Sequence, residues 1–522
     1  MAASTVTDPR LSERVPVRFA ATFAGNVLRA GISFLNSMVV ARGLGASGFG
    51  ELNFLLGSFA AVNNLLDMGT SAAFYTFISR RPRQLRFFLL YLGWMGAQFV
   101  GTVLVVGLLL PKYLVDRIWI GHERGIVLLA FGASFLTTRW WGLLSQLGEA
   151  SKRTVVVQAA SVLRATLHLV LVSAAVYWAR LKVQTVFGLW IAEYLLLTLV
   201  AFGSLLRKNV EKQPASECSV RALVTEFVMY CKPLVLYGWM SFLYLFADRW
   251  LLQRFAGSSH QGFLAVGQQF ANIGLVTAGS ILNVFWKETA EAQYQKNDQR
   301  VRMLYSSLSR GLYFAGAWLG CLLIPYSRNI LTLTLGAGYE PGWLALALMF
   351  LFPMHQCLGQ IQGTFLYASG ATVSYAKIGL WTMGMSIPVT YFMLAPRSMP
   401  VPGLGLGAAG LAAKMVVLQW VGVNLQAYTI ARKNGWKFEY GYQIVTPAIL
   451  LSLALLCKAV IRGSPLPGGL LYIVLSFLLL YRTPLAVGFP RDCLPQMTKR
   501  LMRLLRSCRA GDAPTIAKAE YE

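Results

Sequence analysis

The chain has 522 residues, of which 56% are hydrophobic and only 13% charged, where a soluble domain carries roughly a quarter charged residues. This composition excludes an ordinary water-soluble fold. The formal net charge is +26, from 47 Lys and Arg against 21 Asp and Glu. A nucleic-acid surface or the positive cytoplasmic loops of a membrane protein would each produce such an excess, so the placement of the cations decides between them.

Apolar runs long enough to cross a bilayer recur along the whole chain. A helix needs about 20 mainly apolar residues to span the hydrocarbon core. By that criterion the sequence predicts about fourteen spans, at 19–41, 50–72, 87–110, 119–145, 154–178, 184–205, 227–252, 262–286, 308–325, 343–368, 373–395, 405–430, 441–461 and 467–481. We therefore expect an all-α polytopic membrane protein.

Lys and Arg are concentrated in alternate loops, including 80–86 and 287–302, and in the C-terminal tail. Because such residues collect on the cytoplasmic side, both termini are predicted to be cytoplasmic. The segment 497–509 has an apolar and a basic side, which indicates a helix lying on the membrane surface. Most of the positive charge is thus expected to face anionic lipid, and no nucleic-acid partner is expected.

An internal repeat relates the two halves of the chain at an offset of 212 residues. Residues 42–52 match 254–264 at an Arg, two Gly, a Ser and a Leu, and each copy lies in a turn between two spans. Parallel repeats of this kind are common in transporters, with the substrate site between them. We expect two pseudo-symmetric six-helix bundles plus two C-terminal helices, with domains at 1–205, 206–221 (linker), 222–430, 431–483 and 484–522 (basic tail).

Residues 39–74, VVARGLGASGFGELNFLLGSFAAVNNLLDMGTSAAF, resemble the opening of the polysaccharide transporter or O-antigen flippase family, within the multidrug/oligosaccharidyl-lipid/polysaccharide superfamily. The C-terminal half carries a counterpart at 248–262, and 407–412 also resembles that family. The resemblance implies a flippase that moves polyprenyl-diphosphate-linked oligosaccharide across a bacterial inner membrane, alongside a polysaccharide polymerase and chain-length machinery.

Polar residues on the first span share one helical face. Asn26, Arg29, Ser33 and Asn36 recur at spacings of three and four, which align side chains along a helix. Such a stripe lines a polar lumen or forms a polar helix–helix seam. Arg29 has no acid in its own span, which favours the lumen.

Charged residues elsewhere in the spans are candidates for substrate contacts or gates, because a charge inside the bilayer is costly. Arg139 and Arg164 are predicted to face the lumen. Asp67 is predicted to gate the cytoplasmic end, with pairing to Arg80 or Arg81 as the plainer interpretation. The remaining gating or coupling candidates are Asp248, Arg249 and His168.

Two alternatives stay open for these gating residues. Asp248 and Arg249 form an external ion pair, or Asp248 couples transport to protons. His168 titrates, or it simply makes an internal hydrogen bond.

The tenth span supplies amides, of which Gln356 and Gln360 are predicted to bind sugar hydroxyls. The predicted cavity is therefore cationic in the N-terminal half and rich in amides in the C-terminal half. Arg presents a fork of donors that matches phosphate, so this pattern suits a diphosphate head carrying a sugar chain.

The alternatives are a drug or cation antiporter of the same superfamily, a peptidoglycan precursor as cargo, and a membrane-bound polymerase or transferase. No outside loop is large and no catalytic acid pair is evident, so an enzyme is not expected. No glycine-rich loop is followed by a Walker Lys, and the seven cysteines form no C-x-x-C pair. We expect no cofactor and no metal site.

Overall fold

The computed structural model describes residues 14–80, 83–150, 154–209, 219–295, 297–461 and 465–482. Within these ranges the chain is almost entirely helical and forms no β-sheet. The predicted surface helix at 497–509, the tail at 484–522 and the centre of the linker lie outside the described residues. The all-α expectation is confirmed.

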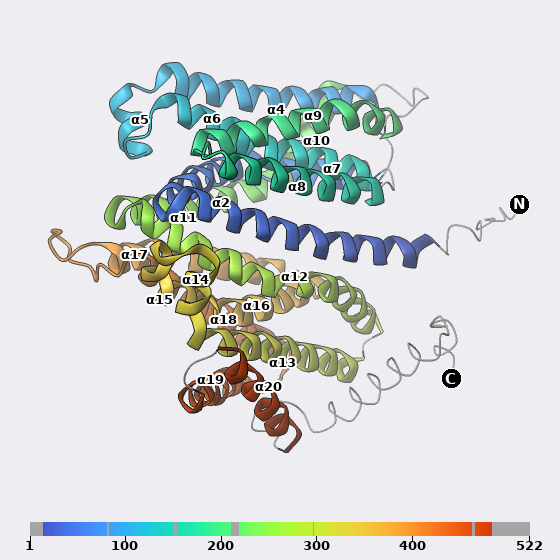
Figure 1. Ribbon diagram of the computed structural model, residues 1–522. Coiled ribbons are helices and arrows are strands. Elements are labelled where there is room, and N and C mark those ends of the chain that lie inside the picture. Colours follow the sequence, from blue (N-terminus) through green and yellow to red (C-terminus); the bar gives the residue numbers. More distant parts are fainter. Residues whose placement is uncertain are drawn as a thin grey trace, which may run out of the picture. The chain divides into compact units, whose positions relative to one another are not determined.

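The helices up to the linker are α2 (Arg14–Asp67), α3 (Thr70–Arg80), α4 (Leu85–Leu104), α5 (Lys112–Ile118), α6 (Arg124–Phe135), α7 (Trp141–Ala150), α8 (Thr154–Tyr177) and α9 (Val183–Asn209). Two π-helical turns, η1 (Val105–Leu109) and η2 (Leu136–Trp140), continue α4 and join α6 to α7. In Figure 1 α2 runs beside α8 and α11, and these helix pairs are in contact.

The helices after the linker are α10 (Val220–Cys231), α11 (Val235–Ala256), α12 (Ser258–Tyr294), α13 (Asp298–Leu323), α14 (Ser327–Leu335), α15 (Trp343–Met349), α16 (Phe352–Ala368), α17 (Thr372–Leu394), α18 (Gly407–Asn434), α19 (Tyr442–Val460) and α20 (Pro465–Arg482). Short 3₁₀ turns lie at Lys232–Leu234 (η3), Ile324–Tyr326 (η4) and Ala337–Gly342 (η5).

Each of the fourteen predicted spans coincides with helical structure, but not always with one helix. The fourth span is built from α6, η2 and α7, and the tenth from α15 and α16. Two further helices, α5 and α14, occupy segments predicted as outside loops. Eight continuous helical stretches of the described chain, some of them built from two or more of these elements, are long and apolar enough to cross a membrane, so the chain is a multi-pass membrane protein.

The chain folds as two compact units. The first contains the described residues up to Ser280 together with Ser327–Phe352 and Val373–Gly422. The second contains Ile281–Tyr326, Pro353–Thr372 and the described residues from Val423 onward. In the second unit α19 packs against α20 and α13. The predicted domain boundaries at 205, 222 and 430 stay predictions.

The two copies of the sequence repeat adopt the same sharp turn in the first unit. Gly45 interrupts α2 with φ 69° and ψ 175°, and Gly257 ends α11 with φ 86° and ψ 176°. These positions are 212 residues apart, which is the offset of the repeat. Positive φ is accessible to glycine at little cost, so the glycine of each copy is explained by its backbone conformation.

The two turns also contact each other through their second glycines. A Cβ atom on Gly50 would clash with the carbonyl of Ser258, and one on Gly262 would clash with the carbonyl of Ala46. Ala46 and Ser258 are themselves 212 residues apart, so the contact is symmetric with respect to the repeat. Ser47 Oγ lies 2.6 Å from Ser258 Oγ beside it.

Candidate functional site

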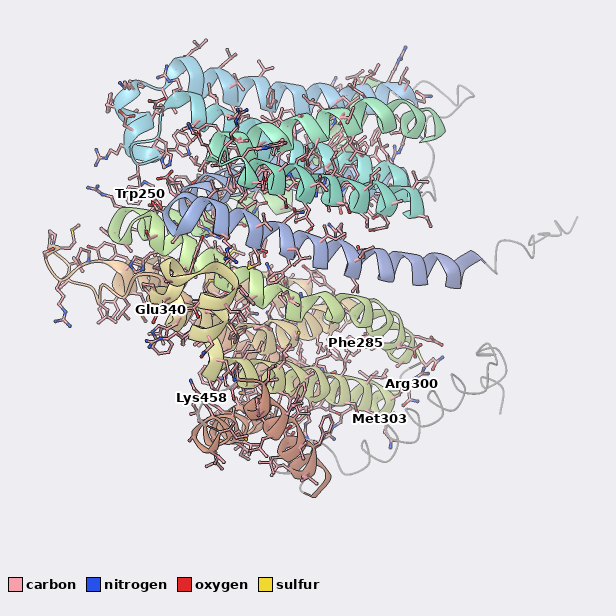
Figure 2. The ribbon with its side chains drawn as sticks, in the orientation of Figure 1. Trp250, Phe285, Arg300, Met303, Glu340 and Lys458 are labelled. Carbon is pink, nitrogen blue, oxygen red and sulfur yellow. The ribbon has the colours of Figure 1, made fainter. Side chains whose placement is uncertain are left out.

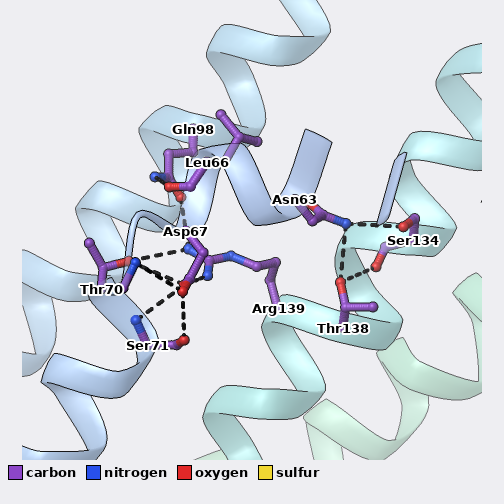
Figure 3. Close-up of polar contacts among 10 residues, drawn as sticks. Asn63, Leu66, Asp67, Thr70, Ser71, Gln98, Ser134, Thr138 and Arg139 are labelled. Atoms are coloured by element: carbon purple, nitrogen blue, oxygen red, sulfur yellow. Dashed lines mark hydrogen bonds and ion pairs between the residues drawn. The ribbon is translucent and has the colours of Figure 1, made fainter. Parts of the chain in front are cut away.

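An ion pair between Asp67 and Arg139 lies at the junction of α2 and α3 (Figure 3). The carboxylate of Asp67 also accepts hydrogen bonds from the Ser71 backbone N–H at 3.2 Å and the Ser71 hydroxyl at 3.0 Å. The buried guanidinium of Arg139 donates to Gln98 Oε1 at 3.1 Å and to Thr70 Oγ1 at 3.4 Å. The Arg139 charge is therefore neutralised within the protein.

The local backbone explains how Asp67 and Arg139 meet. Met68 and Gly69 have positive φ values of 45° and 84°, which end α2 and turn the chain into α3 directly after Asp67. Arg139 lies in the π-helical turn η2, and such turns are frequent at functional positions. Nearby, Asn63 donates to Ser134 Oγ at 3.0 Å and to Thr138 Oγ1 at 3.1 Å (Figure 3).

A second charged cluster joins α8 and α9 in the first unit. Arg164 lies 3.4 Å from the buried carboxylate of Glu193, and His168 Nδ1 lies 2.7 Å from its other oxygen. The Arg164 guanidinium stacks 4.8 Å from the ring centroid of Tyr194. The structure thus brings together two predicted site residues, Arg164 and His168, around the carboxylate of Glu193.

The polar face of the first span divides into two parts. Asn36 is buried and donates to the carbonyl of Ala165 at 2.9 Å, so it contributes to a helix–helix seam with α8. Arg29 and Ser33 are exposed, and Asn26 is half-buried. Among the described residues no carboxylate forms an ion pair with Arg29, which leaves its charge available to a ligand.

The predicted Asp248–Arg249 ion pair is not formed. Asp248 instead pairs with Lys414 of α18, whose Nζ lies 2.6 and 2.8 Å from the two carboxylate oxygens. The hydroxyl of Thr390 donates to the same carboxylate at 2.6 Å. Successive residues on a helix point about 100° apart, so Asp248 and Arg249 face different neighbours.

Arg249 is held by amides rather than by an acid. Its guanidinium donates to Gln268 Oε1 at 2.7 Å and to Gln261 Oε1 at 3.3 Å, both on α12. Its side chain packs closely over Gly57 of α2, where a Cβ atom would lie 2.9 Å from the guanidinium Nε. Gly57 therefore gives Arg249 room to lie against α2.

The predicted amides Gln356 and Gln360 are both half-buried on α16 in the second unit. Gln360 Oε1 is buried and accepts no hydrogen bond in the described structure. Their predicted role as sugar ligands stays a prediction.

Two charged residues that complete these clusters, Glu193 and Lys414, were not predicted as site residues from the sequence. Glu193 is the only acid in the span 184–205, and Lys414 is the only charged residue in the span 405–430. An ionisable residue inside a span marks a functional position by default, so Glu193 was identifiable. Its pairing with Arg164 and His168 was not, because α8 and α9 come together only in the tertiary fold.

Comparison with known proteins now adds to this geometry. Residues 18–285, which are more than half of the chain, match the family described as polysaccharide biosynthesis protein. No curated protein matches the sequence. The structure is similar to the lipid II flippase MurJ in an inward closed conformation, with a TM-score of 0.65, 13% sequence identity, and coverage of 89% of this chain and 99% of that chain.

A MATE transporter in complex with MaL6 is also similar, with a TM-score of 0.51, 12% identity, and coverage of 80% of this chain and 96% of that chain. At these identities the likeness establishes the fold alone. The family match shows that the chain belongs to the polysaccharide biosynthesis protein family. Its fold is the one seen in the lipid II flippase and in the MATE transporter.

Proposed function

We propose that this protein flips polyprenyl-diphosphate-linked oligosaccharide, the repeat unit of a surface polysaccharide such as O-antigen or exopolysaccharide, across the bacterial inner membrane. It acts by alternating access and as a transporter rather than an enzyme. The polysaccharide polymerase and chain-length machinery would receive its product.

The observation that carries this proposal is the exposed charge of Arg29, which has no carboxylate partner among the described residues. Of the four arginines considered within the spans, Arg139 and Arg164 have a carboxylate partner. Arg29 and Arg249 have no carboxylate partner among the described residues, and the guanidinium of Arg249 donates hydrogen bonds to two glutamine side chains. A guanidinium on the first span is suited to a diphosphate, which it can bind with parallel hydrogen bonds.

A drug or cation antiporter is the main alternative. A cation cargo favours acidic or aromatic groups, whereas the acids Asp67, Glu193 and Asp248 are each neutralised by a basic side chain of the protein. The arrangement therefore favours an anionic cargo. A lipid-linked peptidoglycan precursor is the main alternative among anionic cargoes, since one of the similar solved structures is a lipid II flippase.

Replacement of Arg29 tests the proposal. A hydrogen bond to a charged group contributes about 2 kcal/mol, so Arg29→Ala should weaken cargo binding roughly thirtyfold. We expect loss of surface polysaccharide at a normal protein level in a deletion strain complemented with the variant. Arg29→Lys, which keeps the charge but not the planar fork, should restore transport only in part.

Arg86→Ala is the matched control, because Arg86 is an exposed arginine at the start of α4. It takes no part in the ion pairs of Asp67, Glu193 or Asp248. It should leave polysaccharide unchanged. Normal polysaccharide in the Arg29→Ala strain would remove Arg29 from the mechanism. Lysis of the deletion strain, instead of polysaccharide loss, would identify a peptidoglycan precursor as the cargo.

A further inference from the structure

The second unit contains a basic and aromatic pocket that the transport proposal does not use. A cavity of about 280 Å³ lies where the first turns of α13 meet the end of α18 and the segment before α19. Its lining includes three cations, Arg302, Arg310 and Lys437, and several large aromatic side chains, among them Tyr305, Trp436 and Tyr442.

One of the three cations is fixed in position by the protein. Arg310 forms an ion pair with Glu439, and its guanidinium lies 5.7 Å from the ring centroid of Tyr442. Arg302 and Lys437 are exposed, and neither has a carboxylate partner among the described residues. With three cations against the single carboxylate of Glu439, the pocket carries an excess of positive charge.

The aromatic lining is typical of the boundary between membrane and water, where aromatic side chains with a polar edge collect. The rings of Tyr305 and Trp436 lie 5.7 Å apart. Figure 2 shows Arg300 and Met303 at this end of α13, with Lys458 at the opposite end of the second unit. At that opposite end the ammonium group of Lys458 already has a partner in the protein, since it donates to the carbonyl of Pro325 at 2.5 Å.

We propose that this pocket is a binding site for the phosphate group of an anionic membrane lipid. Basic pockets between membrane helices bind such head groups on the cytoplasmic side, where the loop charges of this chain predict both α13 and the α18–α19 segment to face. In this site Arg302 and Lys437 contact the phosphate, and the fixed Arg310 adds to the positive electrostatic potential of the pocket. The aromatic rings pack against the glycerol or the first carbons of the lipid chain.

A phosphate of this kind has two sources in the membrane, the head group of a glycerophospholipid and the diphosphate of a polyprenyl carrier. The site does not depend on which cargo the protein moves. Binding assays that compare the two lipids therefore identify the source without assuming the proposed transport function.

The test measures lipid binding to the purified full-length protein in detergent. The probes are dioctanoyl phosphatidylglycerol, farnesyl diphosphate, and dioctanoyl phosphatidylcholine as a lipid without net charge. We expect Arg302→Ala/Lys437→Ala to weaken binding of an anionic probe about thirtyfold and to leave the weak phosphatidylcholine binding unchanged. Both residues are exposed, so the thermal unfolding midpoint without lipid should not change.

The charge-matched control is Arg397→Ala/Arg432→Ala, which removes two exposed cations that do not line the pocket. It should bind each anionic probe as the parent protein does. Loss confined to phosphatidylglycerol assigns the site to bulk lipid, and loss confined to farnesyl diphosphate assigns it to the carrier. The proposal would be overturned if the pocket variant bound both anionic probes with the affinity of the parent protein. It would also be overturned if the control variant lost as much affinity as the pocket variant.

Discussion

Three acidic side chains within the predicted spans of the first unit are each paired with a basic side chain from another segment of the chain. Asp67 pairs with Arg139, Glu193 with Arg164 and Asp248 with Lys414. A buried charge is costly unless it is paired and hydrogen-bonded, and the Asp248 carboxylate satisfies both conditions through Lys414 and Thr390. Such pairs fix which helices lie together and leave the unpaired cations for ligands.

Removal of one partner of the Asp248–Lys414 pair should destabilise the protein strongly. Lys414 is only 2% exposed and Asp248 8% exposed, so Lys414→Met leaves a buried carboxylate without its cation. We expect a loss of about 3–5 kcal/mol, measured as a lower thermal unfolding midpoint in detergent. The double variant Asp248→Leu/Lys414→Met removes both charges and should recover most of the stability. A single variant as stable as the parent would show that the pair is not a stabilising contact.

The paired turns at Gly45 and Gly257 are the clearest structural trace of the repeat. Their second glycines, Gly50 and Gly262, let the two backbones approach too closely for any side chain. In the proposed transport cycle this contact separates when the cavity opens on the outer side, because both turns lie between spans on that predicted side. In that proposed cycle the close approach corresponds to a state that is closed on the outer side.

Crosslinking of this contact tests its role as a gate. In a cysteine-free background, Ser47→Cys/Ser258→Cys places two thiols where hydroxyl oxygens lie 2.6 Å apart. Oxidation should form a disulfide and stop polysaccharide export, and reduction should restore it. The single-cysteine variants should export normally under oxidation. Full export by the crosslinked protein would contradict a moving gate.

The glycines provide an independent control for the crosslink. Gly50→Ala introduces a Cβ that clashes with the Ser258 carbonyl and should lower the yield of crosslink. Gly31→Ala, also on α2, meets nothing within 4 Å and should leave the yield unchanged.

The orientation of the whole molecule follows from the loop charges alone and is open to direct measurement. The excess of Lys and Arg in alternate loops predicts that both termini face the cytoplasm. Ser398 lies in the loop between α17 and α18, which is predicted outside, and Gln299 lies at the start of α13, predicted inside; both are exposed.

Labelling of single cysteines checks this orientation. In a cysteine-free background, Ser398→Cys should react with an impermeant maleimide added to spheroplasts, and Gln299→Cys should react only after the membrane is permeabilised. The opposite pattern would invert the predicted topology and would place the proposed lipid pocket on the outer side.

The sequence alone determined the fold class, because a helix that spans the bilayer must be an apolar run of sufficient length. All fourteen predicted spans coincide with helical structure, and the repeat offset by itself indicates the two equivalent turns. The individual charged residues of the spans were also visible, since each one stands out in an apolar run.

Only the tertiary structure decided which charged residues are partners. Asp248 was expected to pair with its neighbour Arg249 but pairs with Lys414, 166 residues away, and Asp67 pairs with Arg139 across 72 residues. Periodicity places a side chain on one face of its own helix but carries no information about which distant helix packs against that face. That no carboxylate of the described residues pairs with Arg29 is therefore a property of the packing and not of the sequence pattern.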